Sequence, residues 1–316
     1  MCAQCVTPSI RVSKRSWTLR VESISFDASI ILSSLTKPSG RQISAVTSNP
    51  VRKSERERWS TWFALFGSTL LSAVLSQSVL ATQAACRLDR ADEIAVVEYV
   101  YDGDTILLAD GRKVRLVGID TPELGHDGEP DQPLAKEAKA KLGQLAKPYR
   151  ELQLRYDKQR WDGYGRTLAH LFLMNGTNIQ REMLSNGLAT VIAIPPNLWQ
   201  LKCHLESEAK AQADRRGLWS LPRYQPVKAE ALTKEERGFR VITGRVQRVG
   251  KGRKTIWLHL ARHVVLQIPH SFTHYFTQYR PNQLKGRRVL ARGWVTRSRN
   301  GLRMTIRHPS ALRVLD

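Results

Sequence analysis

The stretch from Asp102 to Glu123 predicts a β-hairpin whose outer ends bring acidic side chains together. Apolar residues lead into and out of the turn Asp110-Gly-Arg112, a pattern typical of two paired strands. Because a hairpin folds its far ends side by side, we expect Asp104 and Asp120 to lie close together, with Glu123 just beyond them. The hairpin therefore predicts a small region rich in carboxylates.

The acidic end of this hairpin predicts a cation site, because crowded carboxylates repel one another unless a positive charge neutralises them. Asp104, Asp120 and Glu123 offer only oxygen ligands, which favours a hard ion such as calcium or magnesium. Arg115 lies inside the second strand, where a charged side chain is uncommon without a partner or a task. A cation beside an arginine is suited to binding a phosphate. A purely structural reading stays open, since Asp-Gly pairs are ordinary turn residues and Asp-Thr-Pro-Glu can cap a helix.

A second arginine stands on a tight turn further along the chain. The sequence Trp161-Asp-Gly-Tyr-Gly-Arg166 directly precedes the apolar run 168–173, which predicts a turn followed by a strand. By itself Arg166 would be interpreted as a solvated turn charge. Together with Arg115 and the carboxylates of the hairpin, it strengthens the interpretation as a phosphate site.

Taken together, these motifs resemble the staphylococcal nuclease (thermonuclease) family. The resemblance rests on four motifs in this order and spacing: Asp102-Gly-Asp-Thr105, Val114-Arg-Leu116, Ile119-Asp-Thr-Pro-Glu123 and Tyr164-Gly-Arg166. It continues through residues 178–189, ends at Arg216-Gly-Leu-Trp219, and covers about residues 92–220. The combination is specific even though each motif alone is not.

The resemblance implies a hydrolase, a metal-dependent endonuclease that acts on DNA and RNA with calcium as its cofactor. It implies that the Asp104 and Asp120 carboxylates coordinate the calcium ion, with the Thr121 carbonyl contributing. Glu123 would position or deprotonate the attacking water as the general base. Similar enzymes cleave the 5′ O–P bond and leave 3′-phosphates.

The resemblance also assigns the contacts to the substrate. Arg115 and Arg166 would hold the phosphate and stabilise the charge that grows on it, because planar guanidinium groups match its oxygens. Tyr164 would bind the substrate by stacking on a base. The chain departs from the family at two places: Gly163 stands where family members have lysine, and residues 193–195 replace the tyrosine pair that cradles the base.

Hydrophobic periodicity predicts five strands and three helices in this region, and the resemblance implies that they form a small OB-fold barrel. The expected fold class is therefore α+β, mainly β with helices. Beyond the hairpin, the expected strands cover 94–101, 152–156 and 168–173, and the expected helices cover 132–147, 179–188 and 197–216.

The N-terminal part of the chain is expected to lie outside the catalytic domain. Residues 1–50 are rich in Ser and Thr without clear periodicity. We expect residues 1–58 to be a disordered segment or an N-terminal extension in which the true translation start lies near Val51. Residues 59–85 carry no charge and end in small residues that signal peptidase accepts, so they predict a signal peptide or a retained membrane anchor. We expect cleavage near Ala84 or Ala85 and an exported protein, periplasmic or secreted.

Export changes the interpretation of the cysteines. Cys86 and Cys203 are the two that remain after such a cleavage, and an even pair in an oxidising compartment is a disulfide candidate. Two unrelated free thiols are the alternative. A bond between the candidates would tie the start of the domain to its last helix.

The C-terminal part of the chain is strongly basic. Residues 237–316 contain 18 Lys and Arg against one acid, so they carry +17 of the formal charge of +22. Five strand-like runs, with a short helix at 272–279 between the third and fourth, predict a second, small OB-like β-barrel after a linker at 221–236. The charge indicates a polyanionic partner, with nucleic acid first and an anionic membrane surface second.

The sequence therefore predicts an exported, calcium-dependent nuclease. Residues 86–220 would cleave DNA and RNA, single-stranded or frayed from a duplex, while residues 237–316 hold the polyanion. A non-catalytic nucleic-acid-binding scaffold is the alternative, although such scaffolds are expected to lose the metal carboxylates or arginines that this chain keeps. No protein partner is evident, and we expect a monomer with transient membrane association through residues 59–85.

Overall fold

The computed structural model describes residues 86–125 and 128–316. All of the described residues belong to the same compact unit of the chain. The expectations for residues 1–58 and 59–85, and with them the signal peptide or anchor, lie outside the described residues. Within residues 86–125 and 128–316, no helix is both long and apolar enough to cross a membrane.

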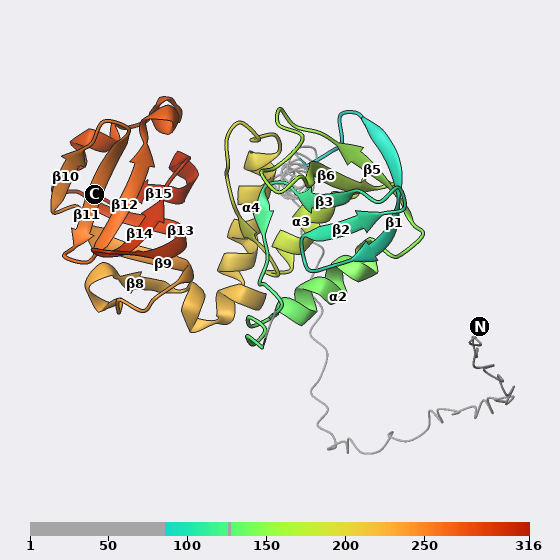
Figure 1. The fold of residues 1–316 in the computed structure, drawn as a ribbon, viewed down its shortest axis with the longest axis horizontal. Coiled ribbons are helices and arrows are strands. Elements are labelled where there is room, and N and C mark those ends of the chain that lie inside the picture. The colour runs from blue at the N-terminus through green and yellow to red at the C-terminus, as the bar shows by residue number, and fades with distance from the viewer. Residues whose placement is uncertain (1–85, 126–127) are drawn as a thin grey trace, which may run out of the picture. The chain divides into compact units, whose positions relative to one another are not determined.

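A closed barrel of five strands forms the first part of the fold (Figure 1). Around the barrel the order is β1 (Glu93–Val100), β2 (Thr105–Leu108), β3 (Lys113–Leu116), β6 (Thr167–Leu173) and β5 (Glu151–Arg155). β5 pairs with β1 and closes the barrel. The pair β3 and β6 is parallel, and the other neighbours are antiparallel. This arrangement confirms the predicted mixed fold with an OB-type barrel.

Alternating apolar side chains fill the barrel, because successive residues of a strand point to opposite faces. In β5, Leu152 and Leu154 are fully buried while the other strand residues are exposed or half-buried. In β3 the buried residues are Val114 and Leu116. Arg115 between them therefore points away from the apolar interior, which explains why a charged residue is tolerated inside this strand.

Three helices pack on the barrel: α2 (Ala135–Leu145), α3 (Ile179–Ser185) and α4 (Leu201–Ala213). Ala138 and Leu142, four residues apart, are buried on one face of α2, as the amphipathic spacing predicts. The three predicted helices are confirmed, but each is shorter than its predicted range. α3, for example, ends before Gly187, whose φ of +66° suits glycine.

The C-terminal part forms a second sheet of eight strands (Figure 1). These are β8 (Pro226–Lys228), β9 (Gly238–Arg245), β10 (Arg248–Lys251), β11 (Thr255–Ala261), β12 (Val264–Pro269), β13 (Arg288–Ser298), β14 (Gly301–Thr305) and β15 (Leu312–Val314). They lie in the order β10-β11-β12-β14-β13-β9-β8, with β15 paired to β13.

The strand order of the second sheet repeats that of the barrel when β9 and β10, two residues apart, are taken as one bent strand. The order that starts from this bent strand is then β11-β12-β14-β13, which corresponds to β2-β3-β6-β5 in the barrel. In the second sheet β12 and β14 are parallel, as β3 and β6 are in the barrel. The hydrogen-bonded order nevertheless begins at β10 and ends at β8, so it is not a closed ring of strands. The OB-like barrel for residues 237–316 therefore stays a prediction. The helix predicted at 272–279 corresponds to a 3₁₀ helix, η5 (His270–Tyr275).

The segment predicted as a linker, 221–236, is packed against the second sheet. It contains the 3₁₀ helices η3 (Pro222–Tyr224) and η4 (Ala229–Ala231), and its β8 pairs with β9. Ala229 and Leu232 belong to the apolar core of the second sheet. Two prolines and mixed charge favour a loose connection by composition, whereas burial of these apolar side chains holds the segment in place.

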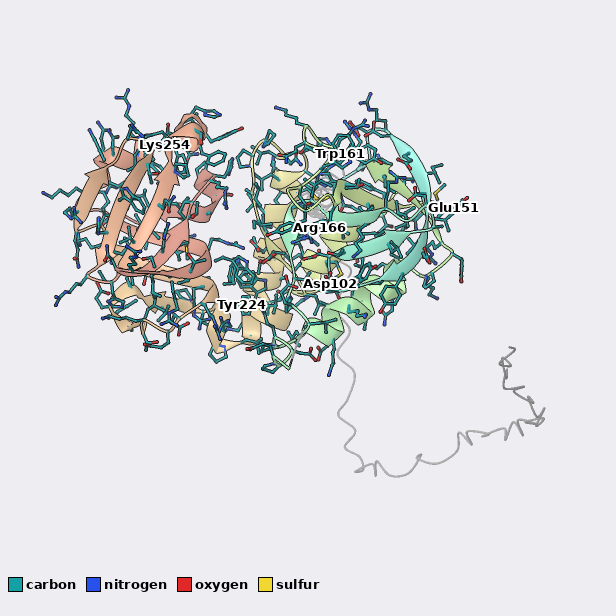
Figure 2. The ribbon with its side chains drawn as sticks, in the orientation of Figure 1. Asp102, Glu151, Trp161, Arg166, Tyr224 and Lys254 are labelled. Atoms are coloured by element: carbon teal, nitrogen blue, oxygen red, sulfur yellow. A yellow bond between two sulfur atoms is a disulfide. The ribbon has the colours of Figure 1, made fainter. Side chains whose placement is uncertain are left out.

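Aromatic side chains connect the end of the barrel region to the second sheet. The rings of Trp219 and Tyr224 meet edge to face, with centroids 5.9 Å apart, and Tyr224 (Figure 2) stacks on Phe239 of β9 at 5.3 Å. All three are buried in one cluster with Ala211 of α4 and Val241 of β9. Burial of this much aromatic surface fixes the second sheet beside α4.

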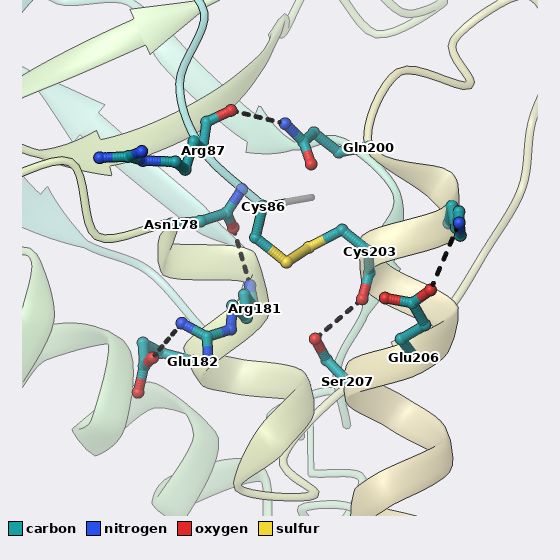
Figure 3. The surroundings of a disulfide bond; sticks show 10 residues. Cys86, Arg87, Asn178, Arg181, Glu182, Gln200, Cys203, Glu206 and Ser207 are labelled. Atoms are coloured by element: carbon teal, nitrogen blue, oxygen red, sulfur yellow. Dashed lines mark hydrogen bonds and ion pairs between the residues drawn. A yellow bond between two sulfur atoms is a disulfide. The ribbon is translucent and has the colours of Figure 1, made fainter. Parts of the chain in front are cut away.

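A disulfide joins Cys86 to Cys203 of α4, with the two Cα atoms 5.3 Å apart (Figure 3). The two cysteines lie 117 positions apart in the sequence. The Gln200 side chain donates a further hydrogen bond, of 2.9 Å, to the carbonyl of Arg87. Both contacts fasten the segment before β1 to α4.

Candidate active site

The loop between β1 and β2 places Asp102 and Asp104 beside α2. The Asp104 N–H donates to the Asp102 carboxylate at 2.9 Å, which shapes a tight turn. Gly103 leaves no room for a side chain, because an added Cβ would lie 2.7 Å from atoms of both Ala138 and Thr121. The turn thus depends on the glycine, and it directs Asp104 into the protein, where the residue is 3% exposed.

A short strand, β4 (Ile119–Asp120), brings the other end of the hairpin to Asp104 and pairs with β7 (Thr190–Val191). The main-chain N–H and the hydroxyl of Thr121 both donate to Asp104 Oδ2 at 3.0 Å. The structure therefore brings Asp104, Asp120 and Thr121 together. The sequence predicts a role for the Thr121 carbonyl, whereas the contacts to Asp104 use its N–H and hydroxyl.

Arg115 links the two carboxylates. Its Nη2 lies 3.0 Å from Asp104 Oδ2 and 3.1 Å from Asp120 Oδ1. Its Nη1 donates to the carbonyls of Leu116 and Ile119 at 2.8 and 2.9 Å. Its side chain is 14% exposed, so most of this guanidinium faces protein partners and only a small part of it is open to a ligand.

Four carboxylates, those of Asp102, Asp104, Asp120 and Glu123, gather near Arg115. Glu123 is an exposed residue whose carboxyl is partly shielded from water. Its pKa is raised to about 7, chiefly by this shielding and then by the negative charges of the three aspartates. Burial also raises the pKa of Asp120 to about 6, although Arg115 opposes the shift. For Glu123 the repulsion from each of the three aspartates exceeds the attraction of Arg115, so the negative charge around this carboxyl is poorly compensated.

The kind of atom that the carboxylate cluster offers as a ligand determines which cation fits the site. The side chains offer carboxylate oxygens, the ligands that hard cations such as calcium prefer. Within residues 86–125 and 128–316, no three His, Cys, Asp or Glu side chains are arranged as a complete metal-ligand group. A cation here would therefore take its remaining ligands from main-chain carbonyls and water. In charge and in donor chemistry the site fits such an ion.

The turn before β6 carries Arg166 (Figure 2) and Tyr164. Asp162 organises this turn, since its carboxylate accepts from the main-chain N–H groups of both residues and from Arg166 Nε at 2.7 Å. The Arg166 guanidinium lies 5.6 Å from the centroid of the Tyr164 ring, and Tyr164 is 89% exposed. An exposed aromatic ring beside an arginine is suited to a nucleotide, because bases stack on rings while the cation meets phosphate.

The predicted side chains line more than one cavity. Arg115, Tyr164 and Arg166 line a cavity of about 300 Å³. Glu123 lines a larger cleft of about 1070 Å³, whose opposite wall comes from the second sheet and the segment before it. The structure thus gathers the predicted arginines and tyrosine at one cavity and places the predicted general base at the other.

Two residues of the site, Asp102 and Trp294, are missing from the set predicted by sequence. Asp102 belongs to the motif Asp102-Gly-Asp-Thr105, so its place next to Asp104 could have been inferred from that spacing. Trp294, on β13, donates from Nε1 to Asp120 Oδ2 at 2.6 Å, although the two residues lie 174 positions apart. No local pattern in the sequence signals a contact of this kind.

Comparisons with known proteins show what this chain is similar to. Residues 113–221 match the profile of the family described as staphylococcal nuclease homologue. A thermonuclease of Staphylococcus hyicus is 36% identical over 125 residues, which span 38% of this chain and 72% of that protein. A thermonuclease of Staphylococcus intermedius is 33% identical over 134 residues, which span 42% of this chain and 79% of that protein. Endonuclease YhcR of Bacillus subtilis is 29% identical over 136 residues, which span 40% of this chain and 11% of that protein.

Proposed function

Since the chain belongs to the staphylococcal nuclease family, we propose that it is a calcium-dependent endonuclease that hydrolyses phosphodiester bonds of DNA and RNA. Membership of the family makes the protein a hydrolytic nuclease and nucleic acids its substrates. The observation that carries the finer proposal is the cluster of four carboxylates around Arg115. This cluster offers both hard oxygen ligands and a candidate general base at one end of the barrel.

Asp104 and Asp120 would hold the calcium ion through their carboxylates, with the Thr121 carbonyl as a further oxygen ligand. The uncompensated negative charge of the cluster supports this assignment, because a cation removes the repulsion between the acids. When bound, the ion would polarise a phosphoryl oxygen and balance the charge of the reacting phosphate.

Glu123 is the proposed general base. Its carboxylate takes a proton from a water molecule, and the water oxygen bonds to phosphorus as the bond to the 5′ oxygen breaks. The departing oxygen takes up a proton, and the product keeps a 3′-phosphate. The position of Glu123 on the wall of a cleft supports this role, because substrate and water can reach it there.

Arg166 and Arg115 are the proposed phosphate contacts. Arg166 is the more accessible of the two, with 31% of its side chain exposed against 14% for Arg115. Positive charge aimed at the phosphoryl oxygens stabilises the charge that develops on them as the bond breaks. The exposed ring of Tyr164 beside Arg166 would stack on the adjacent base.

The basic C-terminal part is proposed to hold the nucleic acid next to the active site. Residues 237–316 contain 18 Lys and Arg against one acid. Arg237, Arg240 and Arg297 line the same cleft as Glu123. Lys and Arg side chains release counterions from phosphates when they bind, so this surface would raise affinity for nucleic acid without reading its sequence.

Export is the proposed localisation, with the disulfide between Cys86 and Cys203 as support, because such bonds persist in oxidising compartments. N-terminal sequencing of the protein recovered from the periplasm or the medium tests it. A mature chain that begins at Ala85 or Cys86 is expected. A product that retains Met1 and stays in the cytoplasm would contradict the proposal.

Degradation of single-stranded DNA, double-stranded DNA and RNA by the purified full chain tests the proposed activity. The reaction is run with calcium, with magnesium and with a chelator. Glu123→Gln removes the basic carboxylate while keeping its size, and Glu151→Gln at an exposed position of β5 is the matched control. We expect calcium-dependent cleavage by the wild type and by Glu151→Gln, and a loss of about 100- to 10,000-fold in kcat for Glu123→Gln.

Three other outcomes would change the proposal. Tight binding of nucleic acid without cleavage in either metal would support the non-catalytic scaffold instead. Cleavage that survives the chelator would remove calcium from the mechanism. Equal activity of the Glu123→Gln and Glu151→Gln proteins would remove Glu123 as the general base.

A further inference from the structure

Trp294 of β13 contacts the carboxylate cluster from the second sheet. Its Nε1–H donates to Asp120 Oδ2 at 2.6 Å. The other oxygen of this carboxylate, Oδ1, lies 3.1 Å from Nη2 of Arg115. Because each oxygen is held by a different side chain, the plane of the Asp120 carboxylate is fixed from two sides. The Asp120 side chain is 13% exposed, so little water competes with these partners.

Neighbouring contacts keep β13 in place beside the barrel region. Arg292 precedes Trp294 by two residues on the same face of the strand, and it pairs with Glu208 of α4. Glu208 also accepts a hydrogen bond of 2.6 Å from the Val191 N–H. Val191 lies on β7, which pairs with β4, the strand of Asp120. The strands that carry Trp294 and Asp120 are therefore tied together at a second point.

An indole N–H is chemically suited to orient a carboxylate that binds a cation. It is a donor only and carries no charge, so it neither coordinates a cation nor neutralises Asp120. A lysine or arginine in its place would add a second positive charge to that of Arg115 and oppose a bound cation further. Neutral hydrogen bonds behind a metal ligand fix the direction in which the ligand points, and their loss weakens both binding and activity.

We propose that Trp294 is a positioning residue of the active site, which holds the Asp120 carboxylate in the orientation that calcium requires. The second sheet is then a part of the catalytic machinery as well as a binding surface. This inference rests on the proposed function for the identity of the ion. It assigns a role in the reaction to a region beyond the family match, which ends at residue 221.

Calcium affinity and turnover of the full-length Trp294→Phe protein test the proposal. Phenylalanine keeps an aromatic ring without the N–H, whereas Trp294→His keeps a ring N–H donor. Trp257→Phe, on β11 of the same sheet, is the matched control for loss of an indole elsewhere. Calcium alone is titrated into each protein by calorimetry, and kcat and KM for DNA are measured at saturating calcium. Thermal unfolding without calcium verifies that each variant is folded.

We expect Trp294→Phe to weaken calcium binding and to lower kcat, each by about 10- to 100-fold, with a smaller change in KM. Trp294→His is expected to recover part of both losses, which a general packing role of the indole would not explain. The Trp257→Phe protein is expected to match the wild type in both measurements.

The inference would be overturned if a folded Trp294→Phe protein kept the calcium affinity and kcat of the wild type. A change in KM alone would overturn it as well, since the indole would then be a substrate contact. A gain in calcium affinity would show that Trp294 competes with the ion for Asp120. Absence of cleavage by the wild type would instead remove the proposed function, and the calcium titration would still decide whether Trp294 orients Asp120.

Discussion

The Arg292 guanidinium on β13 pairs with the Glu208 carboxylate on α4, and the Glu208 side chain is 2% exposed. Loss of one partner leaves the other charge buried without compensation. We therefore expect Arg292→Met to lower the free energy of unfolding by about 3–5 kcal/mol. Urea unfolding followed by circular dichroism measures the difference.

Two further variants decide whether the buried charge is the cause. Glu208→Leu in the Arg292→Met background removes the remaining charge, so most of the stability is expected to return. Lys202→Met breaks the exposed pair with Glu206 on the same helix, and its effect is expected to be about 0.3–0.5 kcal/mol. A loss in Arg292→Met no larger than that in Lys202→Met would show that the buried pair contributes little.

The disulfide between Cys86 and Cys203 closes a long loop, because the two residues lie 117 positions apart. Such a bond restricts the unfolded chain, so its removal in a Cys86→Ala/Cys203→Ala protein is expected to cost about 2–5 kcal/mol of stability. Thermal unfolding with and without a reductant measures the effect. The wild type should lose stability in the reductant, and the double variant should not respond. Equal melting of both proteins without reductant would contradict the expectation.

Two buried histidines predict that the protein loses stability in acid. Burial lowers the pKa of His204 to about 4 and that of His170 well below its ordinary value. Both rings are therefore neutral in the folded protein, whereas in the unfolded chain they bind protons below about pH 6.5. Above that pH the two histidines do not lower the free energy of unfolding, because they are neutral in both states. As the pH falls toward 4, the unfolded chain gains protons and the free energy of unfolding falls, by roughly 3 kcal/mol for His204.

Urea unfolding at neutral pH and near pH 4.5 measures the loss, with His204→Leu as the test variant. Its stability is expected to fall less over this range than that of the wild type, because one proton-binding group has been removed from the unfolded chain. His274→Leu, at an exposed position, is the control and should fall as the wild type does. An equal fall in all three proteins would exclude His204 as a source of acid sensitivity.

The arginines that line the cleft of Glu123 predict salt-dependent binding of nucleic acid. Replacement of Arg237 or Arg297 by Gln is expected to weaken binding and to lessen the slope of log K against log salt by roughly 1. Anisotropy of labelled single-stranded DNA across a salt series, without calcium, measures the slope. Arg253→Gln, in the turn before β11 and outside the cleft lining, is the control. Slopes that change no more than in this control would show that the strand does not pass through the cleft.

Local patterns account for most of the secondary structure. The turn Asp110-Gly-Arg112 between apolar runs predicted the hairpin of β2 and β3, because turn geometry and strand alternation act over a few residues. The same alternation sets the buried positions of β11 (Ile256, Leu258 and Leu260) and β12 (Val264, Leu266 and Ile268) in the second sheet. The composition of the segment 221–236 predicts a linker and does not reveal that Ala229 and Leu232 are buried by a distant sheet.

The sequence by itself determined which side chains are available for the chemistry: the carboxylates of Asp104, Asp120 and Glu123 and the arginines 115 and 166 stand at spacings set by a hairpin and a turn. Only the tertiary structure decided their partners. It placed Arg115 between two acids, and it brought Trp294 to Asp120 across 174 positions. The physical reason is range: propensity and spacing act within one element, whereas a contact between two domains depends on how their complete cores and charges pack together.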